Sequence, residues 1–120
     1  MRFMYESWKI LFYRSPSGEP PVQKFIDSLE LLVQSKVYNS LELLKEFNIK
    51  LGIPHVKKIT NTDLWELRIL GTDNIRLLYI AIIGKTLLLL HAFKKKKQKT
   101  SQKEIKTALE RLTEYRKRIK

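Results

Sequence analysis

The spacing of the apolar residues changes once along this chain, near Val56, and this change limits the folds that are open to it. Before that point, apolar side chains recur every three or four residues, as in amphipathic helices. They are Val22, Phe25, Ile26 and Leu29, and then Val33, Val37, Leu41 and Leu44. After it, apolar and polar residues alternate over residues 63–70, 74–83 and 86–95, which predicts three strands. We therefore expect an α+β fold in which two helices cover one face of a small twisted antiparallel sheet.

Turn residues and the two ends of the chain complete this outline. Pro20 and Pro21 suit the first turn of a helix, and Gly52 and Pro54 end the helical region. Residues 9–13 are apolar and aromatic and run into a turn cluster, so they predict an N-terminal strand. Without repeats or linkers, residues 1–120 are expected to form a single domain.

Two predicted hairpins fix the pairing of the three strands. Gly84 and Lys85 suit a two-residue turn that pairs Ile83 with Thr86. Counting outward places Leu78 opposite His91. In the first hairpin, a three-residue loop of Gly71, Thr72 and Asp73 pairs Leu70 with Asn74 and Arg68 with Arg76. A two-residue loop would turn every side chain to the other face, and the apolar pattern favours the longer loop.

This pairing assigns side chains to two faces of the sheet. The predicted core face carries Trp65, Leu67, Ile69, Ile75, Leu77, Tyr79, Ala81, Leu88, Leu90 and Ala92. The other face carries Glu66, Arg68, Arg76, His91 and Lys95 at one end, with Leu78, Phe93, Ile80, Ile82, Leu87 and Leu89. Beyond the strands, Ser101 and Glu104 match a capping box, which predicts the start of a C-terminal helix that docks at a sheet edge.

Positive charge is concentrated in the last third of the chain. The 120 residues include 24 Lys plus Arg and 12 Asp plus Glu, a net charge of +12. Residues 85–120 hold 13 basic and 3 acidic residues, and therefore account for +10 of it. Such a field attracts polyanions, and nucleic acid is the favoured partner over a membrane surface or an acidic protein. We predict that Lys94, Lys96, Lys97 and Lys99 contact RNA phosphates, and the alternative is a solvated lysine face that keeps the protein soluble.

The opposed arginines suggest a site for phosphate chemistry. Two cations opposite each other on a sheet repel, and a bound phosphate between Arg68 and Arg76 would relieve this conflict. His91 lies diagonally across from Arg76, and its ordinary pKa of about 6.5 suits acid–base catalysis. With Lys95, these residues form the predicted catalytic set. The alternatives are a salt bridge from Arg68 to Glu66 or an N-terminal acid, and a His91 that only fills the core.

RNA cleavage fits such a set because RNA carries its own nucleophile, the 2′-hydroxyl. Strand cleavage then needs alignment, proton transfer and stabilisation of the charged phosphorane, and no metal. The sequence has no Cys and only two His, so neither a thiolate site nor a multi-histidine metal site is expected, and no cofactor is predicted. The longest apolar run has seven residues, so we expect a soluble cytoplasmic protein without a membrane span.

The sequence also resembles a known protein family from about Trp8 to Tyr115. The matching segments are Gly18-Glu19-Pro20-Pro21-Val22 with Phe25-Ile26 and Leu29; Leu64-Trp65-Glu66-Leu67-Arg68; Ile75-Arg76-Leu77-Leu78-Tyr79; and Leu89-Leu90-His91-Ala92-Phe93 with Lys95-Lys96, Lys99-Thr100 and Glu104-Ile105. In this order and spacing they resemble the RelE/ParE toxin superfamily, specifically the phage-derived HigB-like branch of toxin–antitoxin systems.

The resemblance implies a RelE-like fold, ribosome-dependent cleavage of mRNA, and neutralisation by a helix-turn-helix antitoxin similar to HigA, with operator DNA bound through the antitoxin. By motif position, Arg68, Arg76, Lys95 and Lys96 match basic residues of such toxins, and His91 falls where many of this branch carry His. We expect the antitoxin to bind with an acidic segment or to cover the face of Arg68 and Arg76. The alternatives are a non-nucleolytic ParE-type toxin that acts on DNA gyrase, and a basic RNA-binding module without catalysis.

Overall fold

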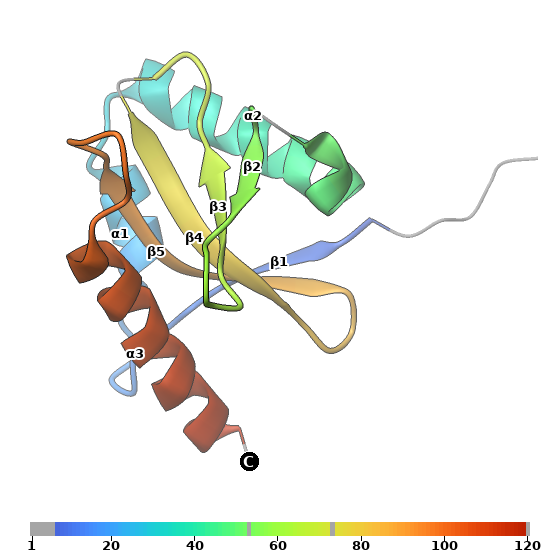
Figure 1. The fold of residues 1–120 in the computed structure, drawn as a ribbon, viewed down its shortest axis with the longest axis vertical. Coiled ribbons are helices and arrows are strands. Elements are labelled where there is room, and N and C mark those ends of the chain that lie inside the picture. Colours follow the sequence, from blue (N-terminus) through green and yellow to red (C-terminus); the bar gives the residue numbers. More distant parts are fainter. Residues whose placement is uncertain (1–6, 53, 73, 120) are drawn as a thin grey trace, which may run out of the picture.

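Five strands form one sheet in the order β1-β5-β4-β3-β2, and three helices cover it (Figure 1). The computed structural model describes residues 7–52, 54–72 and 74–119. The strands are β1 (Lys9–Phe12), β2 (Val56–Lys58), β3 (Trp65–Arg68), β4 (Ile75–Ile82) and β5 (Thr86–Lys94). The helices are α1 (Pro21–Asp27), α2 (Leu31–Phe47) and α3 (Gln102–Arg118), with a 3₁₀ helix, η1 (Asn48–Leu51), after α2. The α+β class is confirmed.

The direction of β1 differs from the prediction. The sheet is mixed, because β1 runs parallel to β5 while the other neighbours pair antiparallel. The strand β2, which pairs with β3, was not predicted. Both differences have the same reason: an edge strand is defined by its distant partner, and a three- or four-residue segment shows too little periodicity to reveal that partner.

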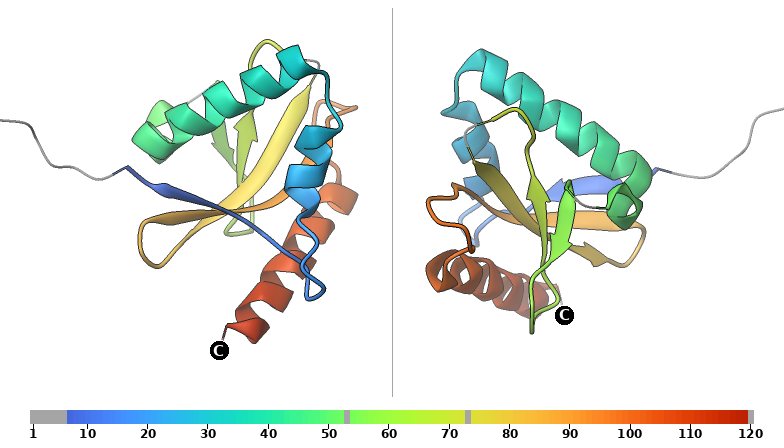
Figure 2. Two further views of the ribbon diagram at one scale, coloured as in Figure 1. Left: turned by 180° about the vertical axis from the view of Figure 1, so that it is seen from behind. Right: turned by 45° about the horizontal axis from the view of Figure 1, so that its top comes forward.

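The two faces of the sheet are both buried, and each has its own helices. Figure 2 shows α1 and α2 on one side of the sheet and α3 on the other. On the first side, Val22, Ile26, Val37, Leu41 and Leu44 from α1 and α2 pack against the sheet, as the helical spacing predicted. On the second side, Ile105, Ala108 and Leu112 of α3 pack on Leu78, Ile80, Leu88 and Leu90.

The position of α3 corrects the prediction that this helix docks at a sheet edge. The central strands β4 and β5 carry apolar residues on both faces, as strands covered on both sides do, so a second helical layer is needed over them. The predicted start of the helix is confirmed, since Ser101 is its N-cap residue. The predicted capping box is wrong, because Ser101 makes no side-chain cap bond and Glu104 binds His91 instead.

The pairing of β3 with β4 agrees with the prediction, and Arg68 lies opposite Arg76. Asp73 of the predicted three-residue loop lies outside the described residues. The β4–β5 turn differs, since Ile82 rather than Ile83 pairs with Thr86 and the loop has three residues. Gly84 and Lys85 both have positive φ there, which is common in such loops.

A bulge in β5 then restores the expected pairing at the far end of the hairpin. Tyr79 pairs with Leu89, but the next residue back, Leu78, pairs with His91, so Leu90 is the extra residue. Between the turn and the bulge, the side chains of β5 therefore lie on the faces opposite to those predicted. Leu87 and Leu89 belong to the core beneath α1 and α2, and Leu88 and Leu90 belong to the core beneath α3. The expected pairs of Leu78 with His91 and Arg76 with Phe93 are confirmed. Ala81, predicted in the core, is exposed because this hairpin projects beyond the helices (Figure 1).

Candidate functional site

The predicted phosphate-binding residues gather where β3 and β5 end and β4 begins, on the face that also carries α3. Arg68 and Arg76 are directly opposed across β3 and β4, and Lys95 follows the last residue of β5. Arg68 is exposed, whereas Arg76 is only 5% exposed. The three cations therefore differ in burial: Arg68 reaches solvent, Lys95 is partly buried and Arg76 is buried.

A single buried carboxylate holds the deeper part of this cluster together. Glu66 is 4% exposed, and its Oε2 lies 3.0 Å from Nε of Arg76 and 3.8 Å from Nζ of Lys95. Its other oxygen, Oε1, accepts a hydrogen bond of 2.6 Å from the Thr100 hydroxyl. The sequence offered either Arg68 or Arg76 as a partner for Glu66. The structure pairs it with Arg76.

The electrostatics of this cluster favour an anionic ligand. Burial lowers the pKa of Arg76, the nearby Arg68 lowers it further, and Glu66 acts in the opposite direction. Burial also lowers the pKa of Lys95; Glu66 opposes this shift, while Arg76, Lys57 and Arg68 add to it. Three cations thus surround one carboxylate, and the charge of the cluster is compensated only in part.

An open groove of about 430 Å³ gives a ligand access to these cations. We call it the clamp groove. It is lined by Arg68, Asn74, Arg76, Lys95, Lys96, Lys97 and Gln98. Within the Arg76 guanidinium, Nε faces Glu66 and Nη1 donates to the Ile75 carbonyl at 3.1 Å. Its remaining N–H groups make no hydrogen bond with any residue in the described ranges, so they can serve a phosphate oxygen.

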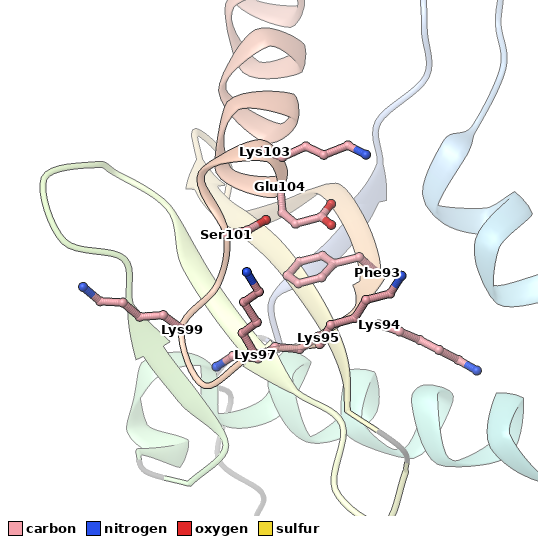
Figure 3. A pocket seen from close by; sticks show the side chains of 9 residues that line it. Phe93, Lys94, Lys95, Lys97, Lys99, Ser101, Lys103 and Glu104 are labelled. Atoms are coloured by element: carbon pink, nitrogen blue, oxygen red, sulfur yellow. The ribbon is translucent and has the colours of Figure 1, made fainter.

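A second cavity, of about 230 Å³, lies on the other side of the loop that follows β5. We call it the Glu104 cup. It is lined by Phe93, Lys94, Lys95, Lys96, Lys97, Lys99, Ser101, Lys103 and Glu104. Figure 3 shows Ser101 and Glu104 projecting from the start of α3 over the ring of Phe93, with the lysine side chains spread around them. The loop lysines 95–97 form a wall that the cup and the clamp groove share.

His91 lies beside this cup and lines neither cavity. Nη1 of Arg111 donates to Nδ1 of His91 at 3.1 Å and to the Leu90 carbonyl at 2.8 Å. Because Nδ1 accepts, Nε2 carries the ring proton and donates it to Oε1 of Glu104 at 2.6 Å. Burial lowers the pKa of His91, and the bond to Glu104 opposes this shift. The catalytic role of His91 stays a prediction, but its place in the structure is that of a neutral link between β5 and α3.

The predicted RNA-binding lysines separate into two kinds. Lys94, Lys96, Lys97 and Lys99 are exposed, whereas the Lys95 side chain is only 9% exposed and turns toward Glu66. Sequence reasoning missed Lys57, which pairs with Glu66 across β2 and β3 and shares its face. The turn residues that precede β3 could have indicated a hairpin and hence this strand. Thr100, Glu104 and Arg111 were missed as partners because their contacts are long-range.

The buried neutral state of His91 makes stability depend on pH. In the unfolded chain His91 titrates near pH 6.5, and in the folded protein its pKa is lower. As pH falls below about 7.5, the unfolded state takes up a proton that the folded state does not, so stability decreases until the folded pKa is reached. His91→Gln, whose amide can still donate to Glu104, should remove this slope of up to about 1.4 kcal/mol per pH unit.

The measurement is urea unfolding of the parent and the variant at pH 7.5 and pH 5.5. His55→Gln, the same change at the other histidine, leaves the contacts of His91 with Glu104 and Arg111 in place and serves as the control. An equal loss of stability between the two pH values in the parent and in His91→Gln would contradict the assignment of a neutral His91.

Comparison with known proteins shows that the region containing this site matches one protein family. The model of the family described as "Phage derived protein Gp49-like (DUF891)" matches residues 24–113, which include both cavities. No curated protein matches the sequence. The family-level part of the resemblance is confirmed, and the HigB-like branch stays a prediction. No helix in the described part of the chain combines the length and apolar composition that crossing a bilayer requires.

Proposed function

Because this chain belongs to the phage-derived Gp49-like family, a family of RelE/HigB-like toxins, we propose that it is the toxin of a toxin–antitoxin system and cleaves mRNA on the ribosome. The observation that carries the proposal is the opposed pair Arg68 and Arg76 with Lys95 in one open groove. This arrangement costs folding energy without an anion and suits a phosphodiester. Ribosome dependence rests on the family resemblance.

In the proposed reaction, the 2′-oxygen of one nucleotide attacks the adjacent phosphorus. The bond from O2′ to phosphorus forms, the bond from phosphorus to O5′ breaks, and the products end in a 2′,3′-cyclic phosphate and a 5′-hydroxyl. Arg68 and Arg76 hold the non-bridging oxygens, on which charge increases in the transition state. Lys95, whose pKa burial lowers, gives a proton to the leaving O5′ and regains one from water. In the open groove, water takes up the proton of the 2′-hydroxyl.

The test is to sequence RNA ends after brief induction of the protein in cells. Cuts within translated messages, absent from cells that express Arg76→Lys, are the expected result. DNA damage signalling without such cuts would favour the gyrase-directed alternative. An absence of both would favour a binding module without catalysis.

We also propose the partner that silences this toxin, a helix-turn-helix antitoxin similar to HigA that is encoded next to this gene and can carry the pair to operator DNA. Support comes from the uncovered charge of the clamp groove and the exposed loop lysines. In the complex, an acidic segment should lie against Arg68 or the lysines of residues 94–99. A structure of the complex that leaves this whole surface open would contradict the proposal.

The loop lysines should govern ribosome binding rather than the chemical step. Replacing Lys94, Lys96 and Lys97 with Gln removes three exposed cations, each of which contributes roughly 0.7–0.9 to the salt slope of binding if it contacts a phosphate. We therefore expect the slope of log affinity against log salt to fall by about 2. Cleavage at saturating protein should largely recover.

The measurement is ribosome binding at several salt concentrations, together with single-turnover cleavage. The matched control replaces three exposed lysines outside both cavities, Lys9, Lys50 and Lys117, and removes the same charge. If the two triple variants change the slope equally, net charge and not the loop accounts for binding.

A further inference from the structure

The Glu104 cup presents a carboxylate within a ring of lysines, which is unexpected on a surface that binds phosphates. Oε1 of Glu104 accepts a hydrogen bond from Nε2 of His91, but Oε2 has no hydrogen-bond partner among residues 7–52, 54–72 and 74–119. The Glu104 side chain is 25% exposed and forms part of the cavity lining. A carboxylate here repels a phosphate oxygen and attracts an N–H donor, so the cup and the clamp groove prefer different parts of a nucleotide.

The remaining features of the cup fit a flat aromatic group. Phe93 lies next to Glu104 in the lining (Figure 3). Its ring stacks on that of His91, with the ring centroids 5.3 Å apart. The cavity of about 230 Å³ is several times the roughly 30 Å³ that a water molecule occupies in the liquid, which leaves room for one flat ring system such as a nucleobase.

The neighbouring groove supplies the other half of a nucleotide site. The wall of lysines 95–97 separates the cup from the clamp groove. A strand that crosses this wall can leave one phosphate beside Arg76 and place an adjacent base against Glu104. His91 fixes the carboxylate by donating to Oε1, and Arg111 fixes His91 in turn.

We propose that the Glu104 cup binds a nucleobase with an exocyclic amino group, next to the phosphate held in the clamp groove, and that Glu104 selects against uracil. The inference rests on the proposed function only in that RNA lies along the clamp groove. The 4-amino group of cytosine donates a hydrogen bond to Oε2, whereas the 4-oxo group of uracil presents lone pairs to a carboxylate. Because these two bases have the same size, Glu104 distinguishes them by hydrogen bonding and not by shape.

The experiment compares binding of two fluorescent hexanucleotides, all-cytidine and all-uridine, by anisotropy with the full chain. Both carry 2′-O-methyl groups, so the proposed cleavage cannot occur. We expect the parent to bind the cytidine oligonucleotide about tenfold more tightly. Glu104→Gln should bring the two affinities within about twofold, because its amide can keep the bond to His91 while presenting N–H groups to uracil. Arg68→Ala should weaken both oligonucleotides and keep their ratio.

A second variant covers the case in which Glu104→Gln does not fold. Ser101 lines the cup and makes no side-chain cap bond, so Ser101→Trp fills the cavity without removing a contact of Glu104. Ser101→Trp should also bring the affinities for the two oligonucleotides close to each other. Equal affinities in the parent, no binding by the parent, or an unchanged ratio in a folded Glu104→Gln or Ser101→Trp would overturn the inference. None of these results depends on cleavage, which the RNA-end experiment tests separately.

Discussion

Replacing Arg76 with lysine should lower the single-turnover rate of mRNA cleavage on the ribosome by about 10²- to 10³-fold, the usual effect of losing one transition-state donor. Lysine keeps the positive charge beside Glu66 but loses the planar fork of N–H groups. Arg76 uses Nε for Glu66 and part of Nη1 for a carbonyl, and the other N–H groups face the clamp groove. A single ammonium cannot hold Glu66 and two phosphate oxygens in the same geometry.

The comparison is made at saturating protein, so that binding does not limit the rate. Arg116→Lys is the matched control, because Arg116 is exposed and lies 4.0 Å from Asp63 outside the clamp groove. It should cleave at the parental rate. If Arg76→Lys also cleaves at nearly the parental rate, Arg76 is only a structural partner of Glu66, and the catalytic assignment must move to the lysines after β5.

The pairing of Arg68 with Arg76 could be predicted because the apolar pattern decides between the two possible loop lengths. Only the three-residue loop brings the apolar sides of β3 and β4 to the same face, and this fixes the register. The bulge at Leu90 could not be predicted in the same way, since a run of four leucines shows no alternation. That run is buried on both faces, and only its packing between two helical layers decides which leucine is the extra residue.

The candidate site shows a similar division between local and long-range information. The residue types and spacing indicated which cations meet at the end of the sheet, but not how deep each lies. Glu104 is the clearest case, because its spacing from Ser101 matches a helix cap while its carboxylate bonds to His91, 13 residues away. A partly buried imidazole offers the carboxylate a stronger interaction than a solvent-exposed helix end does. Local pattern therefore predicted the helix start correctly and the role of its acidic residue incorrectly.

The largest loss of stability is expected from Glu66→Gln. The variant keeps the size of the side chain and a hydrogen bond to Thr100, but it leaves Arg76 and Lys95 without a buried counter-charge. Removing one partner of a buried ion pair costs about 3–5 kcal/mol, and the retained amide places our expectation near 3 kcal/mol. Urea unfolding at low ionic strength measures the change. Glu42→Gln is the matched control, since Glu42 is 72% exposed and its pair with Lys45 should contribute less than about 1 kcal/mol.

The same variant tests whether the cluster accepts an anion. Because Glu66→Gln leaves Arg68, Arg76 and Lys95 of the clamp groove without the carboxylate between them, inorganic phosphate should bind the folded variant and raise its free energy of unfolding as its concentration increases. The parent, whose carboxylate already compensates Arg76 and Lys95, should gain less from the same concentrations. Sodium chloride at equal ionic strength separates specific binding from screening. If phosphate stabilises Glu66→Gln no more than sodium chloride does at equal ionic strength, the loss in Glu66→Gln comes from the missing carboxylate alone, and the groove does not hold a phosphate.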